Sequence, residues 1–143
     1  MSAEENKALV RRWFEALDKG DLEVINELLP VDYRDHNPSI PNMPAGREGV
    51  QQAARLLRSA FPDAVHTIEE QIAEGDKVMT RVTTRGTFLG EIFGLQPTGR
   101  VVEVSGVAVH RIADGRLVEH WAILDMAGFV QQIGGSLDML PPQ

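Results

Sequence analysis

Three side chains that can accept and donate protons lie beside apolar segments of this sequence: His36, His120 and Asp125. His120 lies within a mostly apolar run, 117–125, which Asp125 closes. An imidazole or carboxyl group in apolar surroundings acquires the shifted pKa that general acid–base catalysis near neutral pH requires. We therefore treat the three as candidate catalytic residues. His36 or Asp125 would move a proton, and His120 would orient or stabilise an enolate.

Each of these residues also has an ordinary structural role open to it. Asp125 precedes an expected C-terminal helix, and aspartate is among the best helix N-caps. Alternation along a strand places His120 and Asp125 on opposite faces, so they share a cavity only if a β-bulge intervenes. His36 lies either at the mouth of a cavity or exposed in a turn that Asp35 and Asn37 stabilise.

The other two histidines carry little functional signal. His110 ends a strand pattern and is expected to be structural, and His66 begins an earlier strand pattern. The four histidines lack the close spacing of metal ligands and the chain has no cysteine, so we expect neither a metal nor another cofactor. The sequence has no serine-hydrolase elbow and no glycine-rich phosphate loop opening a helix, which disfavours those two classes of enzyme.

The N-terminal part of the chain carries three helix patterns. Ser2 and Glu5 fit a capping box, and apolar residues then recur with helical spacing until Gly20. A shorter pattern covers 22–29, and a third covers 47–61. These helices should each bury one apolar face.

Beyond residue 63 the periodicity changes to that of β-strands. Strands are expected at 64–73, 77–88, 101–112 and 117–125. Helices followed by antiparallel strands indicate an α+β fold rather than alternating α/β. We expect one domain over 1–143, with the helices covering a curved antiparallel sheet of about four strands and leaving an internal cavity.

Large apolar and aromatic side chains should line this cavity and bind the substrate. The expected lining residues are Trp13, Phe14, Tyr33, Met79, Phe88, Phe93 and Trp121. Such a lining would suit a small, hydrophobic organic molecule.

The composition narrows the class of protein. The chain has 143 residues with 43% hydrophobic and 24% charged residues, which is typical of a globular protein. A net charge of −7 argues against nucleic-acid binding. No apolar run is long enough for a membrane span and the N-terminus is no secretory signal, so we expect a cytoplasmic protein. The open sheet face predicts a homodimer.

An ordered series of short motifs resembles the SnoaL-like polyketide cyclase and ester cyclase family, which has the nuclear transport factor 2-like fold. The motifs are Phe61-Pro62-Asp63, Ala73-Glu74-Gly75-Asp76-Lys77-Val78, Gly86-Thr87-Phe88, Pro97-Thr98-Gly99-Arg100 and 114–121. The resemblance implies a cone-shaped α+β domain with a mostly apolar cavity. It also implies an aspartate acting as general acid/base in an intramolecular aldol closure, without metal or cofactor. Many members carry an acid directly after the motif tryptophan, where this chain has Ala122.

The leading hypothesis is therefore a cofactor-independent general acid/base enzyme of cyclase, lyase or isomerase type. Its substrate would be a small, largely apolar molecule such as a polyketide-like ester or ketone. A non-catalytic small-molecule-binding domain is the first alternative, and Ala122 favours it. An epoxide-hydrolase-like or dehydratase-like activity is the second, because the fold hosts several reactions.

Overall fold

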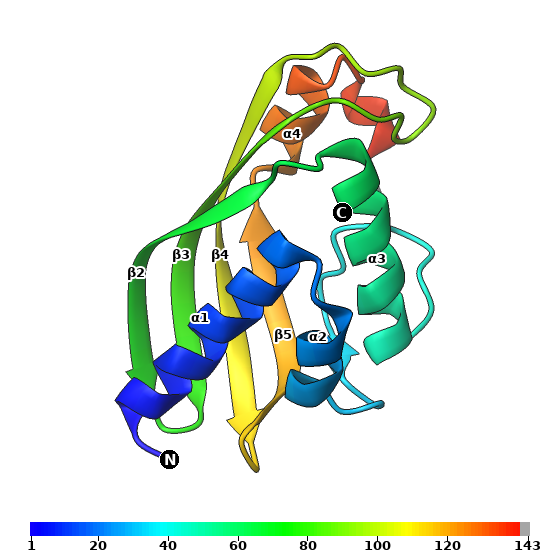
Figure 1. The fold of residues 1–143 in the computed structure, drawn as a ribbon. Helices are drawn as coiled ribbons and strands as arrows, with labels where there is room; N and C mark the ends of the chain where they lie inside the picture. Colours follow the sequence, from blue (N-terminus) through cyan, green and yellow to red (C-terminus); the bar gives the residue numbers. More distant parts are fainter. Residues whose placement is uncertain (141–143) are drawn as a thin grey trace.

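Three helices precede the long strands along the chain, in the predicted order. The computed structural model describes residues 1–140. Its elements are α1 (Ala3–Lys19), α2 (Leu22–Leu28), β1 (Arg34–Asp35), α3 (Arg47–Ala60), β2 (Val65–Glu74), β3 (Lys77–Thr87), β4 (Val101–Ala113), β5 (Arg116–Leu124), α4 (Met126–Gln132) and the short 3₁₀ helix η1 (Leu137–Met139). Figure 1 shows α1, α2 and α3 on one side of a curved sheet, with α4 near the far end of the long strands. This is the predicted α+β cone.

The sheet contains one strand more than the sequence indicated. Its order is β1-β5-β4-β3-β2, and adjacent strands from β2 to β5 run antiparallel to one another. The added strand β1 has two residues, Arg34 and Asp35, and pairs in parallel with β5 opposite Glu119 and His120. Two residues are too few to show a periodic pattern, so the sequence indicated a loop there. The pairing fixes this segment against β5.

The caps of α1 form as the sequence predicted. The Ser2 hydroxyl accepts a hydrogen bond from the Glu5 backbone N–H, and the Glu5 carboxylate accepts one from the Ser2 N–H, both at 3.1 Å. Gly20 ends the helix with φ +66°, a left-handed conformation that glycine adopts without steric cost. Val10, Trp13 and other residues on the apolar face of α1 are buried against the sheet.

Two clusters of buried residues hold the helices on the sheet. The first joins α1 and α2 to the concave face and includes Trp13, Phe14, Ile25, Tyr33, Val78, Val82 and Leu117. The second lies toward α4 and includes Phe61, Phe88, Val102, Phe129 and Ile133. The space between helices and sheet is therefore filled at both ends, and the cavities described below lie between these packed regions.

The convex face of the sheet is open in this structure. The side chains of Ile72 and Ile123 on this face are 54% and 82% exposed. The homodimer stays a prediction that these exposed side chains favour.

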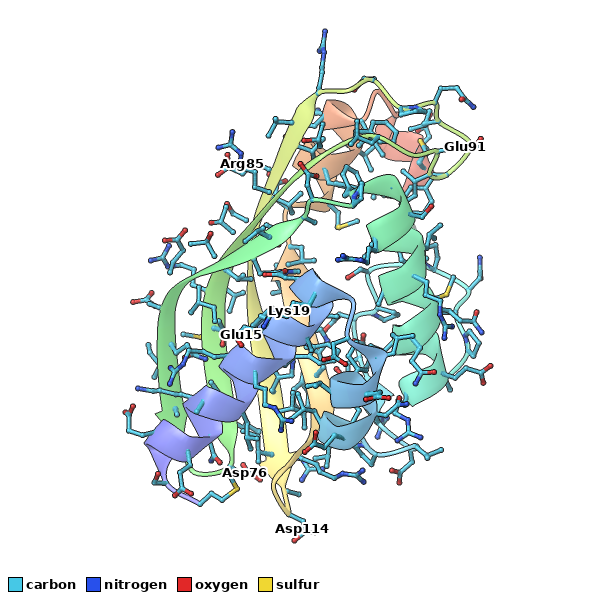
Figure 2. All side chains as sticks on the ribbon, in the orientation of Figure 1. Glu15, Lys19, Asp76, Arg85, Glu91 and Asp114 are labelled. Atoms are coloured by element: carbon cyan, nitrogen blue, oxygen red, sulfur yellow. The ribbon has the colours of Figure 1, made fainter. Side chains whose placement is uncertain are left out.

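Charged side chains such as Glu15, Arg85 and Glu91 project from the surface in Figure 2. Within residues 1–140, no helix combines the length and the apolar character needed to cross a bilayer.

Candidate active site

A cavity of about 350 Å³ lies between the helices and the concave face of the sheet. Trp13, Phe14 and Tyr33 line it, as the sequence predicted. Most of the surface around them is apolar, with contributions from Val50, Ala53, Leu57, Val82, Ala108, Ala122 and Leu124. A cavity of this kind suits an organic ligand with a few polar groups.

The polar wall of the cavity is built by β1 and β5. Asp35 and His120 are register partners in this parallel pair, and Oδ1 of Asp35 lies 3.0 Å from Nδ1 of His120. Both side chains line the cavity. When Asp35 is ionised, the neutral imidazole donates its Nδ1–H to the carboxylate and keeps a lone pair on Nε2. The pair can therefore act as an oriented general base.

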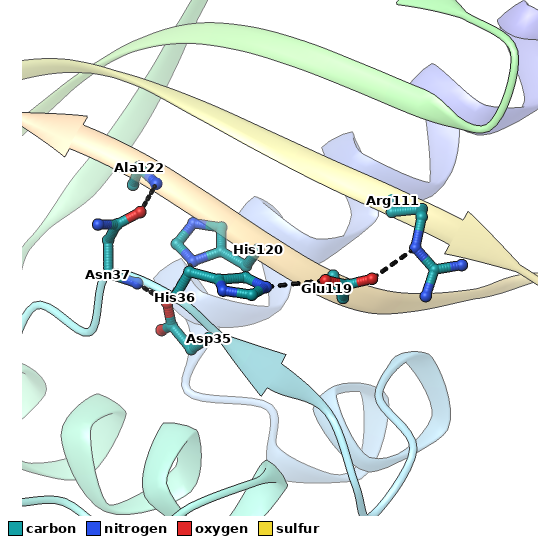
Figure 3. A network of polar contacts seen from close by, with 7 residues as sticks. All are labelled: Asp35, His36, Asn37, Arg111, Glu119, His120 and Ala122. Carbon is teal, nitrogen blue, oxygen red and sulfur yellow. Dashed lines mark hydrogen bonds and ion pairs between the residues drawn. The ribbon is translucent and has the colours of Figure 1, made fainter.

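Neighbouring backbone groups fix the Asp35 carboxylate (Figure 3). Its Oδ1 atom also accepts a hydrogen bond from the Asn37 N–H at 3.0 Å. The Asn37 side chain in turn accepts one from the Ala122 N–H at 3.0 Å, which extends the contact between this segment and β5. The carboxylate is thus held by the backbone N–H of Asn37, two residues further along the chain, while it orients the ring of His120.

Two buried residues set the surroundings of His120. Tyr33 is 2% exposed, and burial raises the pKa of its phenol well above the ordinary value, with the charge of Asp35 raising it further. The phenol therefore stays protonated and can donate a hydrogen bond. His110 is fully buried, its ring centroid lies 4.7 Å from that of His120, and neither ring nitrogen finds a partner within the described residues. Burial lowers the pKa of His110 well below its ordinary value, and the charge of His120 lowers it further.

His36 lies on the other face of the sheet, outside the cavity. Its Nε2 atom contacts Oε2 of Glu119 at 2.8 Å, and the same carboxylate accepts a hydrogen bond from Arg111 at 2.7 Å. The His36 ring stacks on Trp121 with 4.7 Å between centroids and 1° between planes. Strand alternation is the reason, because His36 follows Asp35 and must point the opposite way. His36 therefore does not lie at the mouth of the cavity, which was one of the two positions expected for it.

Asp125 lies just beyond the end of β5 and caps α4. Its Oδ1 atom accepts a hydrogen bond from the Gly128 N–H at 2.9 Å, and the residue is exposed. It does not line either cavity found in the described part of the chain. The structure therefore does not bring Asp125 and His36 together with His120.

Four of the expected lining residues also lie away from the cavities. Met79 and Trp121 occupy the convex row opposite Val109, because their positions alternate with those of cavity-facing neighbours. Phe88 is fully buried in the core cluster near α4, and Phe93 lies in the exposed loop after β3. The expected lining is corrected for these four residues, since size and apolarity do not tell which face a side chain occupies.

Asp35 is the site residue that sequence reasoning missed. The sequence suggests for it only the stabilisation of a turn around His36, one of two alternatives for the polar, proline-containing Tyr33–Pro38 stretch. The alternation of that stretch was a usable signal, because Tyr33 and Asp35 share a parity and both face the cavity. Among residues 1–140, no three or more histidine, cysteine or acidic side chains are grouped so that they could hold a metal ion.

Comparison with known proteins agrees with this fold. The sequence model of the SnoaL-like polyketide cyclase family matches residues 7–133. The chain belongs to this family. It is 31% identical over 134 residues to the aklanonic acid methyl ester cyclase DnrD of Streptomyces peucetius, with 88% of each chain covered. Membership confirms the predicted family and supports the prediction that the protein is an enzyme of cyclase type.

Solved structures give the same result for the fold. TsrD of Streptomyces laurentii superposes with a TM-score of 0.85 at 29% identity, covering 95% of this chain and 99% of that one. IdmH of Streptomyces antibioticus, a proposed polyketide cyclase, superposes with a TM-score of 0.78 at 34% identity, covering 90% and 98%. Both cover nearly all of this chain, and the predicted α+β fold of this family is confirmed.

Proposed function

We propose that the protein catalyses an intramolecular aldol ring closure of a polyketide-like methyl ester, with His120 as general base. The observation that carries this proposal is the 3.0 Å contact between His120 and Asp35 on the wall of a largely apolar cavity. The relative DnrD bears the name of an aklanonic acid methyl ester cyclase, which makes such an ester the first substrate to test. No metal or cofactor is required for this chemistry.

In the proposed reaction, the proton that His120 removes from the substrate is returned to the product by the same residue. Nε2 of His120 removes a proton from the carbon next to a substrate carbonyl, and Asp35 stabilises the imidazolium that results. The enolate carbon then forms a bond to a second carbonyl carbon of the same molecule. The oxygen of that carbonyl becomes an alkoxide and takes the proton back from His120. The product is an isomer of the substrate.

Tyr33 supplies the group that stabilises the enolate. Its phenol lines the same cavity and remains protonated, since burial raises its pKa. A neutral phenol in apolar surroundings donates a strong hydrogen bond to a developing oxyanion. His110 remains neutral behind His120, so it adds no positive charge that would hinder protonation of the base.

The first prediction concerns the pair itself. Aklanonic acid methyl ester is incubated with the wild-type protein, His120→Gln and Asp35→Asn, and ring closure is followed by chromatographic retention and absorbance because mass does not change. We expect His120→Gln to lower kcat by about 10²–10⁴-fold, the range for loss of a general base. Asp35→Asn should lower it at least tenfold, since the imidazole loses its orienting carboxylate.

The double variant is the matched control. Two residues that act as a unit give a double variant about as slow as the worse single one. Turnover of His120→Gln within about twofold of the wild type would overturn the assignment. Tight binding of the ester without conversion by the wild type would indicate a binding domain, the alternative that Ala122 favours, because this cavity-lining residue has no acid.

A further inference from the structure

A second histidine–aspartate pair lies on the cavity wall, on the same concave face as His120 but at the far edge of the sheet, where β2 lies. Nδ1 of His66 at the start of β2 lies 2.6 Å from Oδ1 of Asp18, near the end of α1. The Asp18 carboxylate also accepts the backbone N–H of His66, at 3.1 Å to each oxygen. Arg58 donates to the Asp18 backbone carbonyl at 2.6 Å. The ring of His66 is therefore held in one orientation.

His66 faces the interior where two cavities adjoin. It lines the cavity that contains His120 and also a second one of about 230 Å³, which extends toward Phe61, Val104 and Phe129. Thr84, its register partner on β3, lines both cavities as well. The ring of His66 packs against Phe14 with 5.1 Å between centroids. A polar pair thus interrupts an otherwise apolar wall.

One nitrogen of His66 remains available to a ligand. Nδ1 is taken up by Asp18, and Nε2 makes no hydrogen bond to any of the residues that the structure describes. With Nδ1–H donated to the carboxylate, the neutral ring presents Nε2 as an acceptor. A hydroxyl group of a ligand can donate a hydrogen bond to such an acceptor.

His66 and His120 are too far apart to touch the same atom of a substrate. His66 is level with Thr84 on β3, whereas His120, through His110, is level with Val78. Six positions along a strand correspond to roughly 20 Å. A molecule that reaches both histidines must therefore be elongated.

We propose that His66, oriented by Asp18, binds a hydroxyl group at the end of the substrate remote from the reacting carbon. It thereby selects elongated ligands that carry a hydroxyl group at that end over ligands that lack one. This inference rests on the proposed function, which places the reacting carbon at His120. A purely structural link between α1 and β2 would use the same Asp18 contacts but would not discriminate among ligands.

The test measures binding, so it does not depend on turnover. The probes are 2-hydroxyanthraquinone, at a pH where its phenol is protonated, and anthraquinone itself. Dissociation constants are measured by tryptophan fluorescence quenching in a Trp121→Phe background. That background leaves Trp13 in the cavity wall as the reporter, because the chain has two tryptophans. We expect the hydroxylated probe to bind about tenfold more tightly, the value of one buried hydrogen bond.

Two variants of His66 distinguish the role of Nδ1, which contacts Asp18, from that of Nε2, which is proposed to contact the ligand. The amide of His66→Asn can still contact Asp18 but has no atom at the position of Nε2, so the preference for the hydroxylated probe should vanish. The longer amide of His66→Gln reaches the Nε2 position and should restore part of the preference. His120→Gln should retain the preference in full, because it leaves the His66 end unchanged. Circular dichroism spectra confirm that each variant is folded.

Several results would overturn the inference. These are equal binding of the two probes by the wild type, a preference that survives in His66→Asn, a preference lost in His120→Gln, and no binding of either probe. Failure of the proposed function is recognised separately, because it appears as unchanged turnover in His120→Gln and leaves these dissociation constants unaffected.

Discussion

Two histidine–carboxylate pairs are built from consecutive residues, Asp35 and His36 at the end of β1 and Glu119 and His120 on β5, and they lie on opposite faces of the sheet (Figure 3). Asp35 and His120 meet on the concave face, at 3.0 Å. His36, directly after β1, and Glu119 on β5 meet on the convex face at 2.8 Å. The two distances are nearly the same. The pairs differ in the carboxylate, in the ring nitrogen that makes the contact, which is Nδ1 in His120 and Nε2 in His36, and in their surroundings.

Those surroundings assign different roles to the two pairs. Hydrogen bonds from His36 and then from Arg111 lower the pKa of the Glu119 carboxyl, which stays ionised and neutralised by its partners. The stacking of His36 on Trp121 occupies one face of its ring. The inner pair instead borders an apolar cavity beside Tyr33. A histidine–carboxylate pair is therefore a candidate base only where a substrate can reach it.

The largest expected effect is the difference in kcat between variants of the inner pair and variants of the outer pair, measured in the same assay. His36→Gln and Glu119→Gln should keep the rate of ring closure within about threefold of the wild type. The inner-pair variants should lose at least a factor of ten, because only Asp35 and His120 line the cavity. The measurement is kcat for the ester substrate, after each variant is shown to be folded. A loss of activity in His36→Gln as large as that in His120→Gln would abolish the distinction between the faces.

His110 provides a second contrast, this time in stability. Its depressed pKa keeps the buried ring neutral in the native state, while in the unfolded chain it protonates below its ordinary value of 6.5. The unfolded state then binds more protons, so stability is lost as pH falls below this value, by up to about 1.4 kcal/mol per pH unit. His110→Leu should remove this part of the pH dependence.

The measurement is urea unfolding of the wild type and His110→Leu at several pH values on either side of 6.5. The two curves of unfolding free energy against pH should converge in slope above this value and diverge below it. Parallel curves in the acidic range would show that the native ring of His110 protonates without cost, contrary to its burial.

The smallest effect is expected at Asp125, which lies beside the site without entering it. Asp125→Ala removes the N-cap of α4 and should cost about 1 kcal/mol of stability with activity retained. Asp125→Asn keeps a capping side chain and should be close to neutral in both measurements. Thermal unfolding and the ester assay test this, and a folded Asp125→Asn with strongly reduced kcat would restore Asp125 as a catalytic acid.

The sequence predicted the fold further than it predicted the site. Apolar periodicity and caps such as Ser2 and Gly20 are local signals, and the helices and long strands follow them closely. The strand β1 has two residues and exists because the edge of β5 offers backbone partners. Asp35 therefore could not be placed from local patterns, although its parity with Tyr33 hinted at a shared face.

The alternation of side chains along a strand shows which residues share a face, wherever the sequence predicts a strand. The alternation that separates His120 from Trp121 can be counted along the sequence, and the structure shows it on β5. What counting could not give was which of the two faces is covered by helices. Their size favours a place for Met79 and Trp121 in the cavity lining, yet both lie on the convex side.

The amino-acid sequence by itself determined the order of elements, the family and the presence of proton-transferring residues near apolar strands. Only the tertiary structure decided which histidine meets which carboxylate. Asp35 and His120 are 85 positions apart in the chain, as Asn37 and Ala122 are, and Asp18 and His66 are 48 apart. The reason is physical. Local patterns fix how a segment folds, whereas the pairing of strands and the packing of helices fix which remote side chains share a cavity.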